Sequence, residues 1–279
     1  MITVALLANP DSGTGQASRV QRELSALGAE VDLYPPSHWQ AVARSKARRI
    51  VVAGGDGSVG AAAAAAAHAN VPLAVVPVGT ANDFARALEL PDELAAACRL
   101  AVHGIRTRAL DLGRMGRRPF VNAASVGLPP AAARNARGWK RLLGSLAYVW
   151  GSLRAGLSAK PIACALRCDG SEVFSGRAWQ ATVACTGAFG AGSRVDADPS
   201  DGALDAILVE AAPRPALAIR AVGLRRGSLE SQRGVRSFRG RRIELQVPEG
   251  TAYNVDGEVV EANGVVFTAA PRAFEVVVG

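Results

Sequence analysis

Long apolar runs, paired cysteines and clustered histidines are all missing from this sequence, and each absence excludes a class of protein. No apolar run approaches the roughly 18 to 20 residues that span a bilayer. The segment Ile2–Ala8 is too short for a signal peptide and lacks its basic flank. The three histidines stand far apart and the cysteines show no CxxC spacing, which favours buried thiols in a reducing compartment over a zinc site. We therefore expect a soluble, cytoplasmic protein. The cysteines are Cys98, Cys164, Cys168 and Cys185.

Two common nucleotide-binding motifs are also missing. No GxxxxGK[ST] sequence occurs, which argues against a P-loop. The segment Gly13–Ser18 reads GxGxxS, one glycine short of a dinucleotide fingerprint, and its glycines begin several residues after the preceding strand rather than at its end. Asp32 follows the glycines at nearly the sequence spacing expected of an acid that binds the ribose of a dinucleotide. A nicotinamide site is therefore only weakly indicated.

The positive charge is concentrated in the middle of the chain. Of the net charge of +8, residues 1–112 contribute zero, residues 113–242 contribute +13 and residues 243–279 contribute −5. A basic segment of this kind indicates an anionic partner, either nucleic acid or acidic phospholipid, or else a solvated basic face. No nucleic-acid reading motif accompanies the segment, so we do not expect nucleic acid as the partner.

The first 112 residues repeat one pattern: a short apolar strand, a turn rich in glycine and small polar residues, and a helical stretch. A length of 279 residues already favours two domains over one, and the pattern predicts that the first is an α/β domain with a parallel sheet. In such a sheet, the turns after the strands meet at one edge, where ligands bind. The strands and their turns are Ile2–Leu7 with Asn9–Gly15, Ile50–Val52 with Gly54–Ser58, and Leu73–Val76 with Pro77–Asp83.

After residue 112, apolar residues alternate with polar ones, which is typical of antiparallel strands. A helical stretch over residues 131–157 interrupts them and carries several Arg and Lys residues beside Trp139, Tyr148 and Trp150. That mixture suits either a membrane interface or a core-facing helix with a basic outer side. The expected strands are Ile162–Arg167, Gln180–Cys185, Leu204–Val209, Ile243–Val247 and Val265–Ala269.

The turn Gly54–Ser58, with the sequence GGDGS, suits phosphate chemistry. Its glycines let the backbone turn sharply, and the helix expected over Ala61–Ala67 aims free N–H groups and its positive dipole end at an anion. Asp56 can hold a metal ion or orient a hydroxyl. The plain alternative is an ordinary strand-to-helix connection. A second glycine turn, Gly79–Arg86, adds a hydroxyl, an amide and a carboxylate at a helix start and favours the phosphate site.

Together with Asn9-Pro10-x-Ser12-Gly13, these two turns make the chain resemble the catalytic domain of the diacylglycerol kinase family, whose relatives include sphingosine and ceramide kinases and bacterial lipid kinases. The GGDG turn alone also fits NAD kinases and phosphofructokinases, whereas the GTANDFAR segment at residues 79–86 resembles the lipid-kinase branch. The resemblance spans nearly the whole chain. Its further segments are Asp111–Gly113, Phe120–Asn122, Asp198–Asp205 and Asp256–Glu258.

The resemblance implies an α/β ATP-binding domain over residues 1–112 and a mainly antiparallel, β-sandwich-like lipid-binding domain over residues 113–279, with the last strand or strands returning to the first domain. ATP and the lipid headgroup would then meet between the domains. It assigns Asp256 and Glu258 to catalysis, as the source of the base for the lipid hydroxyl, and Asp198, Asp201 and Ala203 to a magnesium site. The residues assigned to ATP are Asn9, Ser12, Gly13, Gly54, Gly55, Asp56, Gly57, Ser58, Gly79, Thr80, Asn82 and Asp83.

From the residues alone, Asp256-Gly257 is also an excellent hairpin turn between Ala252–Val255 and Glu258–Val260. Both interpretations can hold, because a tight turn is a rigid mount for a carboxylate.

The chain departs from the family pattern at three places. Ser58-Val59-Gly60-Ala61 stands where relatives often continue with Thr-x-Asn-Glu, which loses a polar pair at the helix start. The segment at residues 192–198 looks shorter than in the family and lacks its proline, and Thr186 stands where an asparagine is common. Ser58 keeps the hydroxyl at the nucleotide turn, whereas the other two changes lie nearer the expected lipid side and bear on which lipid is phosphorylated.

We therefore expect an enzyme that uses ATP and Mg²⁺ to phosphorylate a lipid hydroxyl, of the diacylglycerol or sphingoid-base type. Because the acceptor's chains are insoluble, the enzyme is expected to work at the membrane surface, with the basic segment on anionic lipid. The alternatives are an NAD kinase-like enzyme with a soluble acceptor and a non-catalytic lipid- or nucleotide-binding homologue. The oligomeric state is open, with a homodimer among the options.

Overall fold

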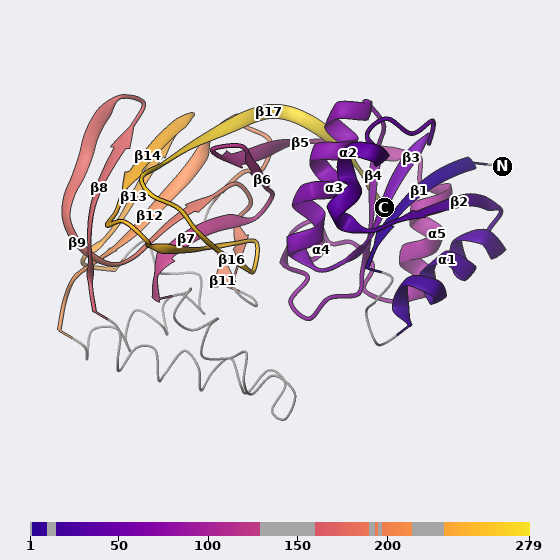
Figure 1. The fold of residues 1–279 in the computed structure, drawn as a ribbon, viewed down its shortest axis with the longest axis horizontal. Helices are drawn as coiled ribbons and strands as arrows, with labels where there is room; N and C mark the ends of the chain where they lie inside the picture. Colours follow the sequence, from indigo (N-terminus) through magenta and orange to yellow (C-terminus); the bar gives the residue numbers. More distant parts are fainter. Residues whose placement is uncertain (1, 10–14, 129–159, 190–192, 195–196, 214–231) are drawn as a thin grey trace.

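The structure is a computed structural model that describes residues 2–9, 15–128, 160–189, 193–194, 197–213 and 232–279. It has an α/β lobe, built from the first part of the chain, and a β-rich lobe (Figure 1). The predicted helical stretch at residues 131–157 and the predicted ATP contacts Ser12 and Gly13 lie outside the described residues. Among the described residues, no helix is both long and apolar enough to cross a membrane.

The α/β lobe is built on parallel strands in the order β2-β1-β3-β4, which confirms the parallel sheet predicted from the apolar strands. Ala8 pairs with Ala53, and Gly54 pairs with Pro77, so the carboxyl ends of β1, β3 and β4 lie side by side. The strands are β1 (Ile2–Ala8), β2 (Ala29–Tyr34), β3 (Arg49–Gly54) and β4 (Leu73–Pro77).

Helices cover both faces of this sheet, because alternate residues of each strand point to opposite sides. Leu7 and Val52 share a core with α2, α3 and α4, whereas Leu6 and Val51 share a core with α1 and α5. The helices are α1 (Gln16–Ala26), a 3₁₀ turn η1 (Pro36–His38), α2 (Trp39–Val42), α3 (Asp56–Ala69), α4 (Asp83–Ala87) and α5 (Leu94–His103).

Helix α3 begins at Asp56, within the predicted turn Gly54–Ser58 and before the predicted helix start at Ala61, and lies against β3, β6 and β17. Its alanine run, residues 62–66, is buried throughout. Alanine is the best helix former and has the smallest side chain that a helix can carry without a loss of propensity. The run therefore lets neighbouring strands approach α3 closely from more than one side.

The β-rich lobe is antiparallel, as the alternating pattern predicts, and all five predicted strand segments fall on observed strands. Its path runs β16-β15-β7-β9-β8-β14-β17, with β12 between β9 and β13. The strands are β6 (Arg118–Phe120), β7 (Ala123–Gly127), β8 (Ile162–Cys168), β9 (Ser171–Ala184), β10 (Ala188–Phe189), β11 (Ser193–Arg194), β12 (Leu204–Glu210), β13 (Val235–Gly240), β14 (Arg242–Gln246), β15 (Ala252–Val255) and β16 (Glu258–Glu261).

Two long strands, β5 (Arg106–Met115) and β17 (Val265–Val278), join the lobes (Figure 1). They pair with each other in an antiparallel ladder that is irregular between Ala270 and Phe274. The first part of β17 pairs with β14 in the β-rich lobe, whereas Val276 pairs with β4 in the α/β lobe. The β5–β17 ladder, interrupted between Ala270 and Phe274, therefore connects the two cores.

Candidate active site

The turns after β3 and β4 touch each other at the carboxyl edge of the α/β sheet. The amide of Val78 donates to the carbonyl of Gly54 over 3.3 Å. A Cβ atom on Gly79 would lie 2.5 Å from the Cα of Gly55. The two turns are thus packed backbone to backbone, which only glycine allows. Asn9 follows β1 at the same edge and is exposed.

The turn at residues 54–58 places the first turn of α3 at this edge. The amide of Ser58 donates to the carbonyl of Gly55 over 2.9 Å, and a Cβ on Gly54 would lie 2.9 Å from the Ser58 Oγ. Gly54 therefore leaves room for the Ser58 side chain. Helix α3 points its amino end, where the backbone dipole is positive, toward the space above the sheet edge.

The carboxylate of Asp56 crosses from one turn to the other. Its Oδ2 accepts from the amide of Asp83 over 3.1 Å, and its Oδ1 accepts from the amide of Phe84 over 2.9 Å and from Asn122 Nδ2 over 2.9 Å. Asp56 therefore caps the start of α4 and ties the α/β lobe to the segment between β6 and β7. In this arrangement the Asp56 carboxylate holds the first turn of α4 and the Asn122 side chain in place.

The loop at residues 79–82 is closed by its own asparagine. Asn82 Oδ1 accepts from the amide of Gly79 over 3.0 Å, and Asn82 Nδ2 donates to the carbonyl of Gly79 over 3.1 Å. This closure holds Asn82 in the left-handed region, at φ 50°. Thr80 is exposed at the tip, while Asp83 is buried and pairs with Arg86 over 3.1 Å. Thr80 thus has the more accessible polar group of the two.

Asp256 lies in the tight turn between β15 and β16, and its carboxylate points into the protein. Asp256 and Gly257 both have positive φ, 47° and 89°, as the hairpin type predicted from this Asp-Gly pair requires. Its two oxygens accept backbone amides from Val121 (2.8 Å), Asn122 (2.9 Å) and Ala123 (3.0 Å). Three donors from one segment make Asp256 the anchor of that segment.

The environment of Asp256 favours the protonated acid. Burial raises the pKa of Asp256 to about 7, and the negative charge of Asp56 adds to the rise, although the three backbone amides lower the pKa. Asp256 is 9% exposed. It therefore has little direct access to a substrate in this conformation.

Glu258, two residues later, is exposed and lies over the first turn of α3. A Cβ on Gly57 would lie 2.9 Å from Glu258 Oε1, and Arg118 of β6 forms an ion pair with the same carboxylate. Slightly more than half of the Glu258 side chain is exposed, at 56%. Of the two predicted catalytic acids, Glu258 is the one that a ligand at the α3 terminus can reach.

Gly60, one of the departures from the family pattern, has a packing role. A Cβ at this position would lie 3.2 Å from the carbonyl oxygen of Pro119 and 3.3 Å from Asp256 Oδ2. The glycine therefore lets α3 settle against β6 and the buried acid. Where relatives often have an Asn-Glu pair, this chain has Gly60-Ala61, and α3 instead packs closely against Pro119 and Asp256.

The predicted magnesium residues lie in the loop before β12, and their carboxylates have protein partners. Asp198 accepts from the hydroxyl of Ser200 over 2.6 Å, which lowers its pKa. Asp201 pairs with Arg239 and accepts from the amide of Ala203 over 2.9 Å. Within the described ranges, no group of three His, Cys, Asp or Glu side chains is placed to share a metal ion. The magnesium assignment stays a prediction.

Sequence reasoning did not assign a role to Asp111, which organises the same loop from β5. Asp111 is 2% exposed, and its carboxylate accepts from the amides of Gly202 (2.5 Å) and Arg272 (2.7 Å). Its own amide donates to the carbonyl of Pro199 over 2.7 Å. The Asp-Leu-Gly segment was one of those that resemble the family. Its role could not be predicted, because the partners of Asp111 lie about 90 and 160 residues away along the chain.

Asn122 and Thr186 are further residues whose roles sequence reasoning missed. Asn122 Nδ2 donates to Asp56, and Asn122 Oδ1 accepts from the Thr186 hydroxyl over 2.9 Å. Both residues are buried, at 3% and 2% exposed. Asn122 lies in a segment that resembles the family, and Thr186 is a departure from the family pattern. Nothing in the sequence indicated that the two side chains are in contact.

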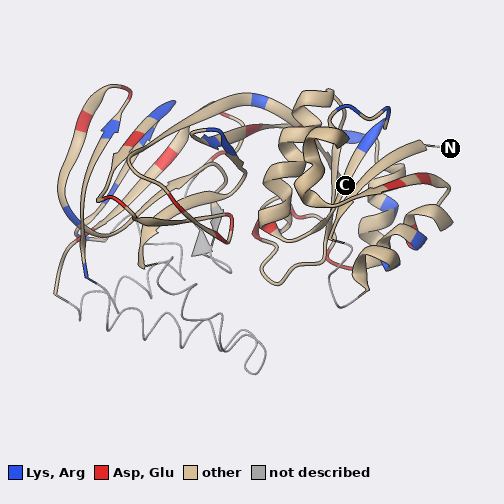
Figure 2. Cartoon of the chain, viewed as in Figure 1, with Lys and Arg blue, Asp and Glu red and all other residues tan. Residues whose placement is uncertain are grey.

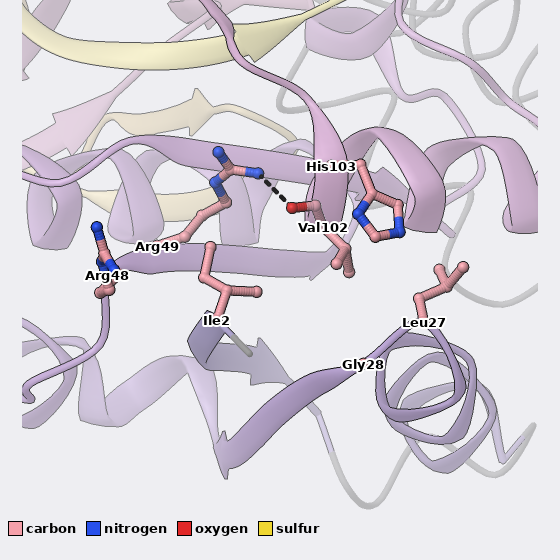
Figure 3. Close-up of a pocket in the computed structure, with 7 residues that line it drawn as sticks. All are labelled: Ile2, Leu27, Gly28, Arg48, Arg49, Val102 and His103. Carbon is pink, nitrogen blue, oxygen red and sulfur yellow. Dashed lines mark hydrogen bonds between the residues drawn. The ribbon is translucent and has the colours of Figure 1, made fainter.

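A separate hollow of about 620 Å³ opens at the amino edge of the sheet, opposite the glycine turns (Figure 3). Arg49 lines it, but its guanidinium donates to the carbonyls of Ala101 (2.6 Å), Val102 (3.2 Å) and Gly104 (2.7 Å), where α5 ends. Arg49 therefore acts as a cap for that helix. The hollow shares no residue with the glycine turns. It is lined by Ile2, Leu27, Gly28, Arg48, Arg49, Val102 and His103.

The fold and these turns define a two-lobed phosphotransferase. The family model described as the diacylglycerol kinase catalytic domain matches residues 3–115, and the one described as the YegS C-terminal NAD kinase beta sandwich-like domain matches residues 122–278. A protein of Pseudomonas fluorescens named "Probable lipid kinase YegS-like" is 31% identical over 82% of this chain and 76% of its own length. A diacylglycerol kinase of Bacillus subtilis is 30% identical over 75% of this chain and 70% of its own length.

The chain belongs to the diacylglycerol kinase family and is a lipid kinase. A solved diacylglycerol kinase of Bacillus anthracis has the same fold, with a TM-score of 0.79 at 20% identity over 99% of this chain and 97% of the other. An NAD kinase of Archaeoglobus fulgidus, solved in complex with ATP, is a more distant neighbour, with a TM-score of 0.54 at 17% identity over 99% of this chain and 93% of the other. A kinase of this family uses ATP as its phosphoryl donor.

Proposed function

We propose that the chain transfers the γ-phosphoryl group of ATP to a hydroxyl of diacylglycerol or of a sphingoid base at a membrane surface. The observation that carries the proposal is the set of three hydrogen bonds to the Asp56 carboxylate. They join the GGDG turn, the GTAND turn and the segment that holds Asp256 into one structure. ATP is expected on the glycine turns and the acceptor hydroxyl on the side of Glu258.

The chain's own groups suit phosphoryl transfer. That reaction needs in-line positioning and charge neutralisation more than covalent help. The rigid turns and the positive end of α3 supply positioned backbone donors for the phosphates. Glu258, beside that end, accepts the proton of the acceptor hydroxyl, and the anchored Asp256 holds the hairpin that carries it. Mg²⁺, which the family implies, neutralises phosphate charge when it is bound.

Contact with anionic lipid is part of the proposal. Arginines lie on several strands of the β-rich lobe (Figure 2), and several of these residues are exposed. Each Lys or Arg near an anionic membrane contributes about 1 kcal/mol of attraction. Some of these arginines have acidic partners, since Arg236 pairs with Glu210 and Arg242 pairs with Glu244. Exposed arginines on β8, β9, β13 and β14, or in the turn between β13 and β14, include Arg167, Arg177, Arg236, Arg239, Arg241 and Arg242.

A panel of acceptors tests the proposal. Purified protein is incubated with labelled ATP and Mg²⁺ in mixed micelles that contain diacylglycerol, sphingosine or ceramide, each with and without an anionic phospholipid, and in parallel with NAD in lipid-free buffer. We expect label in diacylglycerol or sphingosine, faster transfer with the anionic lipid, and no transfer after chelation of Mg²⁺. Label in NAD alone, or in no acceptor at all, contradicts the proposal.

A further inference from the structure

Asn122 contacts three segments at the site: the GGDG turn through Asp56, the Asp-Gly-Glu hairpin through Asp256, and the end of β9 through Cys185 and Thr186. Its side-chain nitrogen donates to Asp56 Oδ1 over 2.9 Å, and its backbone amide donates to Asp256 Oδ1 over 2.9 Å. Its backbone carbonyl accepts from the amides of Cys185 over 2.8 Å and Thr186 over 3.3 Å, at the end of β9. One buried residue thus spans the carboxylates of the GGDG turn and of the Asp-Gly-Glu hairpin.

The orientation of the Asn122 amide follows from its neighbours. An ionised Asp56 only accepts hydrogen bonds, so the NH₂ group of Asn122 must face it, and the amide oxygen must face Thr186. The Thr186 hydroxyl then donates to that oxygen over 2.9 Å. Without the Thr186 hydroxyl, the buried side-chain oxygen of Asn122 would lose this hydrogen bond. The Thr186 hydroxyl therefore supports the amide orientation that the Asp56 carboxylate requires.

The contact with Asn122 is separate from the capping function of Asp56. The two backbone amides of α4, at Asp83 and Phe84, bind Asp56 within the α/β lobe. Asn122 reaches the same carboxylate from the β-rich side, where its own amide also anchors Asp256. Removal of the hydrogen bond from Asn122 to Asp56 would leave the α4 cap in place. The distance between the Asp56 and Asp256 carboxylates would then no longer be held by Asn122.

We propose that Asn122, oriented by Thr186, is a positioning residue for phosphoryl transfer, which sets the distance between the nucleotide turns and the hairpin that carries Glu258. This inference rests on the proposed placement of ATP on the turns and the acceptor near Glu258. Phosphoryl transfer is sensitive to the separation of donor and acceptor, and a misplacement of about 1 Å can cost about a hundredfold in rate. Loss of the Asn122–Thr186 contact should therefore change kcat more than the binding of ATP.

Thr186→Val tests the hydroxyl with almost no change in shape, and Thr182→Val is its matched control. Thr182 is also buried, at 1% exposed, and its hydroxyl accepts from Gln180 rather than from the site. We expect both variants to lose similar stability, but only Thr186→Val to lower kcat, by about tenfold, with the KM for ATP within about threefold. Thr186→Ser keeps the hydroxyl and should restore kcat.

Asn122→Asp adds a readout that a purely structural role would not change. The new carboxylate would face Asp56, so we expect a large loss of kcat above neutral pH and partial recovery as the pH falls and the pair takes up a proton. An unchanged kcat in Thr186→Val, failure of Thr186→Ser to restore it, or a pH-independent loss in Asn122→Asp overturns the inference while leaving an active wild type and the proposed function intact. A wild type that labels no lipid overturns both.

Discussion

At the level of single residues, the two acids of the β15–β16 hairpin have opposite environments. Asp256 is buried and accepts three backbone amides, whereas the Glu258 side chain is 56% exposed beside the first turn of α3. A base must reach the proton that it abstracts. Glu258 meets that condition, and we predict that Asp256 contributes only through the backbone of residues 121–123 that it anchors.

Glu258→Gln is therefore expected to lower kcat for lipid phosphorylation by about 10² to 10⁴. Because the side chain is largely exposed, the free energy of unfolding should change by no more than about 0.5 kcal/mol. The mixed-micelle assay and urea denaturation measure the two effects. Glu261→Gln, an exposed glutamate on the same strand, is the control. If the two variants have equal activity, Glu258 is not the base.

The raised pKa of Asp256 predicts a pH-dependent stability. In the unfolded chain this acid ionises near pH 4, whereas in the folded protein it keeps its proton up to about pH 7. The folded state then binds more protons between these values, so the Asp256 contribution is fully present below about pH 4 and is lost as the pH rises through about 7.

Urea denaturation of wild type and Asp256→Asn at several pH values isolates this contribution. Asp256→Asn should be less stable at every pH, because an amide nitrogen would face backbone N–H donors. The stability difference between the two proteins should shrink as the pH rises from 4 to 7. A difference that stays constant, or grows, would show that the carboxylate is ionised throughout.

At the level of elements, the contact between the two glycine turns is the tightest constraint on the candidate nucleotide site. A Cβ on Gly79 would lie 2.5 Å from the Gly55 Cα and 2.6 Å from Asn82 Oδ1. The Gly55 Cα is a backbone atom, and Asn82 Oδ1 is held in place by the hydrogen bond from the Gly79 amide. One turn must therefore move away from the other if Gly79 gains a side chain.

Gly79→Ala is expected to raise the KM for ATP at least about tenfold and to destabilise the fold by roughly 1–3 kcal/mol, since the strain falls on the backbone. Gly264→Ala is the matched control, because its Cβ would meet nothing within 4 Å. Calorimetry with a non-hydrolysable ATP analogue and thermal unfolding report the two quantities. Equal ATP affinity in the two variants would remove the turns from the nucleotide site.

These elements also show how far the sequence could predict the molecule. Apolar strands followed by glycine turns were sufficient for the parallel sheet, and the Asp256-Gly257 pair was sufficient for its hairpin. Both are encoded locally, by periodicity and by turn propensity. The three donors to Asp256, the pairing of Asn122 with Thr186 and the packing reason for Gly60 were not predictable, because each arises only when segments distant in sequence meet.

At the level of the whole molecule, β5 and β17 make the two lobes mechanically continuous. The ladder between them runs from the pair Phe267 and Met115 to the pair Val278 and Arg106. Where β17 is irregular, Arg272 adopts a positive φ of 46°, and its amide donates to Asp111 over 2.7 Å. A strained conformation of this kind persists only when its surroundings hold it. Asp111 therefore helps to hold β17 in this conformation where the strand passes between the lobes.

Asp111→Ala should destabilise the protein by about 2–4 kcal/mol, because two buried backbone donors lose a charged acceptor. Since β17 pairs with strands of both lobes, we expect hydrogen exchange to accelerate in both the β3–β4 region and the β8–β14 region, and not only beside the substitution. Asp32→Ala, at an exposed position on β2, is the control and should change stability by no more than about 0.5 kcal/mol. Faster exchange in one lobe alone would mean that the lobes unfold independently and that the shared ladder does not couple them. Faster exchange in both would place the coupling in β17, which pairs with strands of both lobes.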